Sequence, residues 1–162
     1  MSRGFLKISE KQWESSVKGI GLPIVLYDDI VLPFRKTNYS AGYDIFSTVS
    51  ITLEPNMSAT VPLGWKVYMQ PNEYLAIVPR SGLGFKYYTR LANTIGIIDY
   101  DYFNNETNEG HCFMKLRNEG DVILHINRGD GIAQAIFMNY LLADDDNYNK
   151  GFERKGGLGH TG

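Results

Sequence analysis

Short apolar stretches separated by turn residues run along most of the chain. Ile51–Leu53 ends at the turn Glu54-Pro55-Asn56, and Tyr74–Val78 is a continuous apolar run. Farther along, Asp121–Ile126 and Ile132–Phe137 have the same character. Apolar runs of this length between turn signals are typical of β-strands. The pattern therefore predicts an all-β domain.

Three segments depart from this pattern. Ser9–Lys18 predicts a short helix with Ser9 as its N-cap, and the polar segment Asn104–Gly110 predicts an exposed loop. The last segment starts with Asp144-Asp145-Asp146 and ends in glycines, so it cannot pack a core of its own. We expect one domain at 1–142, with an N-terminal extension at 1–20, and a flexible C-terminal arm at 143–162.

Length, charge and cysteine content restrict the function. A chain of 162 residues suits a single core. Its net charge of -2 argues against binding nucleic acid through the phosphates. The single Cys112 excludes a cysteine-cluster zinc site and fits a reducing compartment. The chain lacks the roughly 20 consecutive apolar residues of a membrane span. We expect a cytoplasmic protein without nucleic-acid or membrane partners.

Candidate chemistry is found in three places, each with a second interpretation. Ile95, Ile97 and Ile98 would anchor a hairpin that delivers Asp99 as a general base, although an ordinary Asp-rich turn would look similar. Pro79–Gly84 reads equally well as a phosphate-binding loop or as a plain turn capped by Ser81. The glycine-rich end, taken alone, favours a frayed terminus over phosphate binding.

Taken together, five segments resemble the five ordered motifs of the trimeric dUTP diphosphatase (dUTPase) family. The resemblance runs from about Leu32 to Gly162, and five motifs in order are far more specific than any one alone. The long third motif resembles the variant of Gram-positive bacteria and their phages. The five segments are Ala41–Ile45, Pro79–Gly84, Ile95–Tyr102, Gly131–Gln134 and Gly156–Gly162.

The resemblance implies a distorted β-barrel or jelly roll and a homotrimer with active sites shared between chains. It also implies hydrolysis of dUTP to dUMP and pyrophosphate, with Mg²⁺, by attack of water on the α-phosphorus. Such an enzyme keeps uracil out of DNA and supplies dUMP for dTMP synthesis. Few protein ligands to the metal are expected, because Mg²⁺ is held mainly by phosphates and water.

The resemblance also implies a role for each matching residue. Asp99 activates the attacking water, and Asp44 supports the metal through water. The phosphates are bound by Arg80, Ser81, Gly82 and Gln134. The uracil hairpin contributes Asn93, Gly96 and Ile98, and Tyr102 packs on deoxyribose. The C-terminal arm contributes Arg154, Leu158, Gly159, His160 and Thr161.

Two positions depart from the family pattern. Leu158 stands where most members have a phenylalanine that stacks on uracil, and we expect a weaker contact there. Gly131 replaces an arginine, which removes a charge and a structural ion pair.

Two functions other than dUTP hydrolysis alone are alternatives for this chain. A dCTP deaminase-like enzyme would need a glutamate in the strand after the third motif, but Cys112–Asn118 contains no carboxylate. A phage-type dUTPase can also act as a nucleotide-switched regulator of a protein partner. Asn104–Gly110 and Gly4–Ile20 are the candidate docking surfaces for such a partner.

Overall fold

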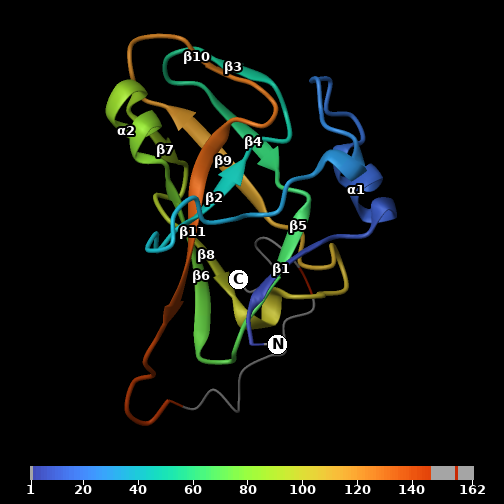
Figure 1. The fold of residues 1–162 in the computed structure, drawn as a ribbon, viewed down its shortest axis with the longest axis vertical. Helices are drawn as coiled ribbons and strands as arrows, with labels where there is room; N and C mark the ends of the chain where they lie inside the picture. Colours follow the sequence, from blue (N-terminus) through green and yellow to red (C-terminus); the bar gives the residue numbers. More distant parts are fainter. Residues whose placement is uncertain (1, 147–155, 157–162) are drawn as a thin grey trace.

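A four-stranded antiparallel sheet, in the order β2-β11-β6-β8, forms the largest layer of the fold (Figure 1). The computed structural model describes residues 2–146 and 156. Within them it contains eleven strands, two short α-helices and two 3₁₀ turns. The strands of this sheet are β2 (Tyr43–Phe46), β11 (Gly131–Asn139), β6 (Glu73–Pro79) and β8 (Gly96–Asp99).

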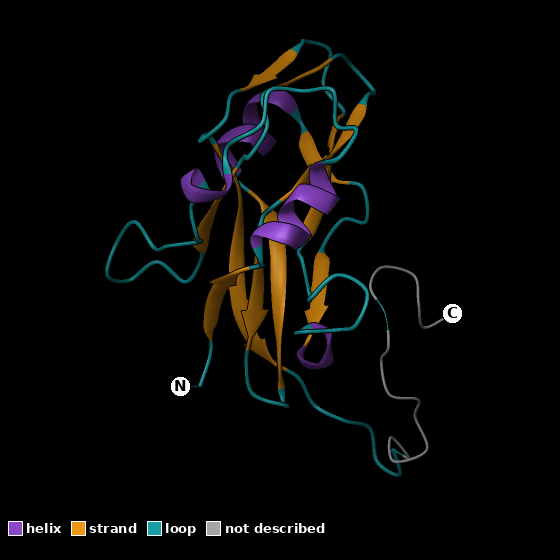
Figure 2. Ribbon diagram, turned by 90° about the vertical axis from the view of Figure 1, so that its right-hand side faces the viewer, coloured by secondary structure: helices purple, strands orange, loops and turns teal. Residues whose placement is uncertain are grey.

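The remaining strands form one smaller sheet and two strand pairs, all antiparallel. Most strands run roughly along the long axis of the molecule (Figure 2). The three-stranded sheet has the order β4-β9-β7, with β4 (Ser58–Pro62), β9 (Phe113–Asn118) and β7 (Thr89–Leu91). The pairs are β1 (Gly4–Lys7) with β5 (Trp65–Tyr68), and β3 (Ile51–Leu53) with β10 (Leu124–Ile126).

One core cluster joins these sheets. Leu75 and Ile77 of β6, Ala135 of β11 and Leu116 of β9 are at most 1% exposed and belong to the same cluster. Alternate residues of β9 and β6 enter it because successive side chains of a strand point to opposite faces. The predicted all-β class is confirmed, and the predicted strands at 51–53 and 74–78 correspond to β3 and β6.

Helix α1 (Glu10–Val17) is the predicted N-terminal helix, and its cap is the predicted one. The side chain of Ser9 accepts a hydrogen bond from the backbone N–H of Gln12, 3.1 Å away. Such a cap satisfies one of the N–H groups that the first turn leaves unpaired. Trp13, 3% exposed, packs the helix into a small second cluster with Ile8 and Ile30.

Helix α2 (Ser81–Tyr87) corrects the prediction of a loop or plain turn at Pro79–Gly84. Arg80 is the N-cap residue, without a side-chain cap hydrogen bond, so Ser81 is the first helical residue instead of the cap. The helix ends at Tyr88, whose left-handed φ of 51° lets its N–H donate to the carbonyl of Gly84. Two glycines and the missing side-chain cap hid this helix from the sequence pattern.

The segment Asn104–Gly110 also differs from its prediction, because it is only partly exposed. Asn105 is 7% exposed and organises the turn. Its Oδ1 accepts from the backbone N–H groups of Thr107 and Asn108, and its Nδ2 donates to the carbonyl of Tyr102. A polar loop can be buried in this way because its own side chains satisfy its backbone. Among the described residues, no helix is long and apolar enough to cross a membrane.

Candidate active site

A buried carboxylate surrounded by donors lies where β2 and β11 pair. Asp44 has a side chain 5% exposed and stands opposite Gln134 in the register of the two strands. The Nε2 of Gln134 donates to Asp44 Oδ1 at 2.9 Å. Lys36 Nζ and Arg80 Nη2 lie 3.3 Å and 3.7 Å from Asp44 Oδ2. We call Asp44, Gln134, Lys36 and Arg80 the β2–β11 cluster.

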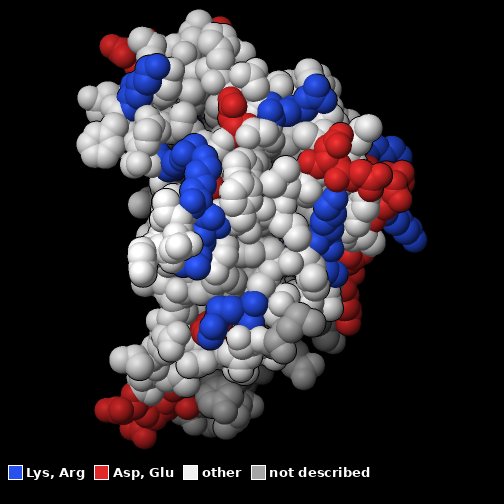
Figure 3. All heavy atoms as spheres, in the orientation of Figure 1, with Lys and Arg blue, Asp and Glu red and all other residues white. Residues whose placement is uncertain are grey.

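Electrostatics hold Asp44 ionised in this cluster. Burial by itself raises the pKa of Asp44, but the hydrogen bonds of Gln134 and Lys36 and the positive charge of Arg80 outweigh it. The net effect is a pKa below the ordinary value for an aspartate. The cluster thus carries one negative and two positive charges. Figure 3 shows a run of Lys and Arg atoms over β2 and β11 with hardly any acidic surface among them.

Two glycines make room for this arrangement. A Cβ at Gly42 would lie 3.1 Å from the side chain of Gln134, so the bare backbone lets the amide reach Asp44. A Cβ at Gly131 would lie 2.6 Å from Arg80 Nη1. The guanidinium of Arg80 therefore occupies the space above β11 that a side chain at position 131 would need. This placement of Arg80 goes with the glycine at position 131.

The first turn of α2 continues the cluster toward solvent. Ser81 and Gly82 are exposed, and a Cβ at Gly82 would meet nothing within 4 Å. The first N–H groups of a helix have no partner within the helix, and Arg80 adds a guanidinium beside them. Arg80, Ser81, Gly82, Gln134 and Asp44, all predicted as site residues, are thus brought together at this end of the sheet.

Asp99 lies at the opposite end of the same sheet. It is the last residue of β8 and pairs with Tyr74 near the start of β6, whereas Arg80 follows the last residue of β6. At about 3.4 Å per residue, this pairing separates Asp99 and Arg80 by roughly 17–20 Å. In Figure 1, α2 lies at the far end of β6 from the yellow turn that follows β8.

The surroundings of Asp99 form an open hollow of about 360 Å³, lined also by Pro71, Tyr100, Asp101 and Tyr140. Asp99 itself is exposed, as the first residue before the 3₁₀ turn η2 (Tyr100–Tyr102). Ile98 packs against the core cluster and fixes the strand end. Ile95 and Ile97 are 44% and 51% exposed, so the expectation that all three isoleucines anchor the hairpin holds within this chain only for Ile98.

A second hollow, of about 300 Å³, lies beside the hairpin between β7 and β8. Asn93 and Gly96 line it, together with apolar residues that include Ile77, Leu91 and Met114. Gly96 favours close packing here, since a Cβ at this position would lie 3.1 Å from the side chain of Ile77. Two of the three hairpin residues that the sequence predicted for substrate, Asn93 and Gly96, therefore border one apolar cavity, and Ile98 does not line it.

Tyr102 is more enclosed than its predicted role suggests. Its side chain belongs to the core cluster and the residue is 5% exposed. Its hydroxyl donates to the carbonyl of His111 at 2.9 Å and accepts from Asn108 Nδ2 at 2.9 Å. Only a small part of this residue therefore stays at the surface, and any contact with a sugar must use that part.

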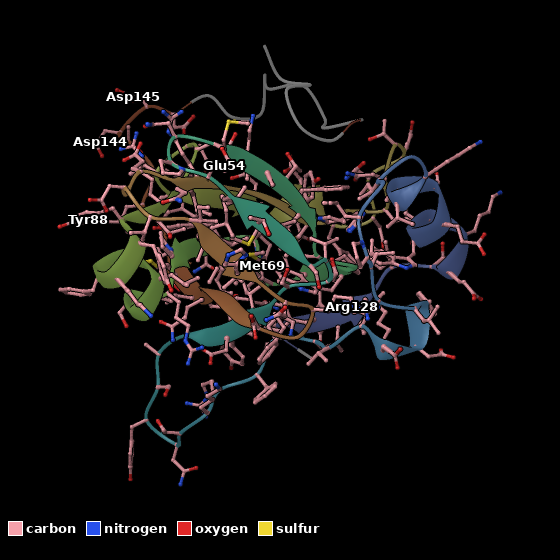
Figure 4. All side chains as sticks on the ribbon, turned by 90° about the horizontal axis from the view of Figure 1, so that it is seen from above. Glu54, Met69, Tyr88, Arg128, Asp144 and Asp145 are labelled. Carbon is pink, nitrogen blue, oxygen red and sulfur yellow. The ribbon has the colours of Figure 1, made fainter. Side chains whose placement is uncertain are left out.

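The predicted arm residues Arg154, Leu158, Gly159, His160 and Thr161 lie outside the described part of the chain. Asp144 and Asp145, near the start of the arm, are exposed and lie at the rim of the molecule (Figure 4). In residues 2–146 and 156, no group of three or more His, Cys, Asp or Glu side chains is placed to hold a metal ion. The sequence did not predict Lys36 as a site residue. The only indication of such a role was a basic pair of residues upstream of Asp44.

The two candidate docking surfaces pack against each other. Glu109 accepts hydrogen bonds from the backbone and hydroxyl of Ser9, and these bind Asn104–Gly110, which we call the polar turn, to the start of α1. Ser16 of α1 contacts the ring of His111 at 2.9 Å. Part of each segment therefore packs against the other segment of the same chain.

The chain is an all-β protein of antiparallel strands. Its surface site, in which the positive side chains of Lys36 and Arg80 lie beside the ionised carboxylate of Asp44, suits a polyphosphate. A family model described as dUTPase matches residues 28–162, and the chain belongs to the dUTPase family.

Relatives and solved structures agree with this assignment. The chain is 42% identical over 133 residues to the deoxyuridine 5'-triphosphate nucleotidohydrolase of Lactococcus lactis subsp. lactis, covering 82% of this chain and 89% of that protein. The crystal structure of dUTPase from Streptococcus mutans aligns with a TM-score of 0.70 and 33% identity, covering 87% of this chain and 98% of that one. This likeness confirms the predicted dUTPase-like β-barrel or jelly-roll class.

A phage structure shares the fold at lower identity. The dUTPase of Staphylococcus bacteriophage 80alpha, solved with dUPNHPP, aligns with a TM-score of 0.63 and 21% identity, covering 87% of this chain and 98% of that chain. At this level the likeness concerns the fold alone. Because the family match begins at residue 28, β1 and α1 lie before it.

Proposed function

We propose that this protein is a dUTP diphosphatase that hydrolyses dUTP to dUMP and pyrophosphate, keeping uracil out of DNA and supplying dUMP for dTMP synthesis. Its family and the names of its relatives support this activity. The observation that carries the proposal is the division of the site: the β2–β11 cluster suits phosphates, and an exposed carboxylate, Asp99, lies at the other end of the same sheet.

Asp99 is the proposed general base. It positions a water molecule and accepts its proton as the water oxygen attacks the α-phosphorus. Pyrophosphate then leaves, and the positive groups of the β2–β11 cluster offset the charge on its oxygens. Arg80 suits this task because a guanidinium can donate two parallel hydrogen bonds to a phosphate. Gln134, Ser81 and the start of α2 provide the neutral donors.

The distance between these groups supports a site shared between two chains. A carboxylate roughly 17–20 Å from Arg80 cannot reach the α-phosphorus of a nucleotide whose phosphates lie on the same chain's cluster. The proposed arrangement therefore has Asp99 and the hairpin of one subunit facing the β2–β11 cluster of another. A closed homotrimer with three shared sites satisfies this requirement.

Mg²⁺ fits this site as a partner of the triphosphate. Asp44 is the carboxylate of the cluster, and its oxygens are already engaged by Gln134, Lys36 and Arg80. Such a donor set suits a hydrated ion carried by the phosphates, with Asp44 interacting through water. When bound, Mg²⁺ would neutralise phosphate charge and orient the leaving group.

The base and sugar would bind along the hairpin. Asn93 and Gly96 border the apolar hollow, and Ile98 belongs to an edge strand whose backbone groups on one side do not pair with β6. Backbone N–H and C=O groups can read the alternating acceptors and donor of a uracil edge. Tyr102 would support the deoxyribose through its small exposed part and leave little room for a 2'-hydroxyl.

The arm at 143–162 is proposed to close over bound nucleotide after the domain at 1–142. Arg154, His160 and Thr161 would contact the outer phosphates, and Leu158 would cover the uracil by an apolar contact. Removing residues 154–162 should therefore reduce turnover while leaving the fold unchanged, because residues 1–142 contain the described core.

Substrate choice tests the proposed function. Pyrophosphate release should be measured with dUTP, dCTP, dTTP and UTP in the presence of Mg²⁺. We expect release from dUTP and little from the other three nucleotides. Absence of release from dUTP would overturn the proposal.

Replacing Asp99 tests its role separately. Asp99→Asn removes the proton acceptor but keeps the shape of the side chain. We expect the affinity for a non-hydrolysable dUTP analogue to stay within about tenfold, or about 1.4 kcal/mol, while hydrolysis falls by orders of magnitude. Binding by titration and single-turnover hydrolysis provide the two values. A parallel loss of both would assign Asp99 a structural role instead.

The deaminase alternative is less well supported. Residues Phe113–Asn118 form the strand β9 that follows the third motif, and they contain no carboxylate that could move a proton. We expect no release of ammonia from dCTP, and ammonia release at a rate comparable to pyrophosphate release from dUTP would favour the deaminase.

A regulatory role is the other alternative. Phage dUTPases, among them that of Staphylococcus bacteriophage 80alpha, control transfer of virulence genes by a proto-oncogenic G protein-like mechanism. That protein is only 20% identical to this chain, and likeness at this level supports the fold alone. Comparing the binding of a protein partner with and without the dUTP analogue would test such a role.

A further inference from the structure

Lys36 lies outside every segment that resembles a family motif, yet it contacts the central carboxylate of the β2–β11 cluster. Its Nζ is 3.3 Å from Asp44 Oδ2. We propose that Lys36 is a further substrate-binding residue, which gives the triphosphate of the nucleotide an additional positive charge. This inference rests on the proposed function and extends it to a residue of this chain's own.

The loop that carries Lys36 is organised by its own hydrogen bonds. Arg35 Nη1 donates to the carbonyls of Asn38 and Ser40, at 3.0 Å and 3.2 Å. The hydroxyls of Thr37 and Ser40 lie 2.6 Å apart. A loop fixed on both sides of Lys36 directs its side chain toward Asp44 at a lower entropy cost than a free loop would.

The base of the loop is fixed to the sheet. The ring of Phe34 stacks on that of Phe46 with centroids 5.0 Å apart, and the N–H of Asp44 donates to the carbonyl of Phe34 at 2.9 Å. Lys36 therefore stands two residues from a backbone contact with the very strand that holds Asp44. Its position is a property of the fold instead of a chance surface contact.

The positive side chains of the cluster are more exposed to solvent than its carboxylate. The side chains of Lys36 and Arg80 are 50% and 36% exposed, whereas that of Asp44 is 5% exposed. An approaching anion therefore meets two cations first, with the carboxylate behind them. Asp44 neutralises at most one of the two, so the cluster keeps a net positive charge at its surface. Phosphate oxygens carry more charge than one carboxylate and can draw the flexible ammonium outward.

The alternative is that Lys36 only neutralises Asp44. That role would stabilise the fold, and it would contribute equally to the binding of every nucleotide. If Lys36 binds phosphate, its contribution to nucleotide binding should instead increase with the number of phosphates. The two roles are therefore separated by comparing a triphosphate with a monophosphate.

The experiment uses the full chain and three variants: Lys36→Ala, Lys36→Arg and the control Lys11→Ala. Lys11 is an exposed lysine of α1, on the side of the molecule away from α2 (Figure 1). Affinities for a non-hydrolysable dUTP analogue and for dUMP are measured by calorimetry at several salt concentrations. Pyrophosphate release from dUTP gives KM and kcat.

For Lys36→Ala we expect binding of the analogue to weaken about tenfold and binding of dUMP to weaken less than about threefold. The salt dependence of analogue binding should become shallower, since one phosphate contact is lost. KM should rise while kcat stays within about threefold. Lys36→Arg should retain most of the affinity, and Lys11→Ala should behave as the unmodified chain does.

Two results would overturn the inference. One is a Lys36→Ala variant that binds the analogue like Lys11→Ala; the other is an equal loss for the analogue and dUMP. Either result leaves the proposed function standing as long as the unmodified chain releases pyrophosphate from dUTP. If it does not, the proposed function itself fails, and the inference about Lys36 fails with it.

Discussion

The imidazole of His111 is fully buried, and both its nitrogens are engaged. Nε2 accepts a hydrogen bond from the backbone N–H of Gly64 at 2.9 Å, so the proton of the neutral ring lies on Nδ1 and points to Ser16 Oγ, also 2.9 Å away. Burial lowers the pKa of His111 to about 4, although the negative charge of Glu109 opposes the shift. This residue joins α1, the polar turn and the start of β5.

His111 predicts how stability depends on pH. Between pH 6.5 and 4 the unfolded chain binds a proton at this histidine and the folded chain does not. The contribution of this histidine to the free energy of unfolding should therefore be complete above pH 6.5 and fall by about 3 kcal/mol as the pH drops to 4. Urea unfolding at pH 7, 6, 5 and 4 measures this change.

His111→Gln should remove most of that pH dependence and lower stability at every pH. The control is His125→Gln, because His125 is an exposed histidine on β10. We expect this control to follow the unmodified chain. A pH dependence that persists in His111→Gln would show that other groups are responsible.

At the scale of elements, the side chain of one serine both caps α1 and contributes to the contact between α1 and the polar turn. Ser9 caps α1, and its hydroxyl also donates to Glu109. Ser9→Ala removes both interactions, and we expect the free energy of unfolding to fall by about 1–2 kcal/mol. Ser15→Ala is the matched control, since Ser15 is an exposed serine of the same helix. Equal effects of the two substitutions would contradict the capping role.

Sequence patterns predicted the elements whose signals are local. The apolar run before Glu54-Pro55-Asn56 ends at the correct residue because a proline turn stops the strand, and α1 begins where a serine caps it. Helix α2 was missed because its signal is weak and its stability comes from tertiary packing, including Leu83 against the core. The burial of Asn105 was missed for a different reason: the partners of its side chain are local in sequence, but they are arranged around it only in the folded turn.

The site residues also differ in whether the sequence indicated them or only the folded chain revealed them. Asp44, Arg80 and Gln134 come from segments far apart in sequence, and resemblance to a family placed them in one site before the structure brought them together. No pattern pointed to Lys36, because its partner is set by the shape of a loop and not by spacing along the chain. Resemblance also did not reveal that Arg80 fills the space left by Gly131.

At the scale of the whole molecule, the pairing of β6 with β8 separates the two halves of the site. Because the sheet is rigid over this length, no local motion within one chain brings Asp99 to the β2–β11 cluster. In the proposed function, each half therefore acts with the complementary half of a neighbouring subunit. The proposed trimer would have three such junctions, and these could also cover two exposed apolar residues of the hairpin, Ile95 and Ile97.

Shared sites predict that two inactive variants restore each other's activity. Asp99→Asn lacks the base, and Arg80→Ala lacks the phosphate ligand. In trimers mixed at random from equal amounts, about a quarter of the junctions would combine an intact Asp99 from one chain with an intact Arg80 from another. Refolding the two variants together should therefore give about a quarter of the unmodified activity, whereas each variant refolded alone should stay inactive. A site contained in one chain would give no recovery, because every chain in the mixture carries one of the two defects.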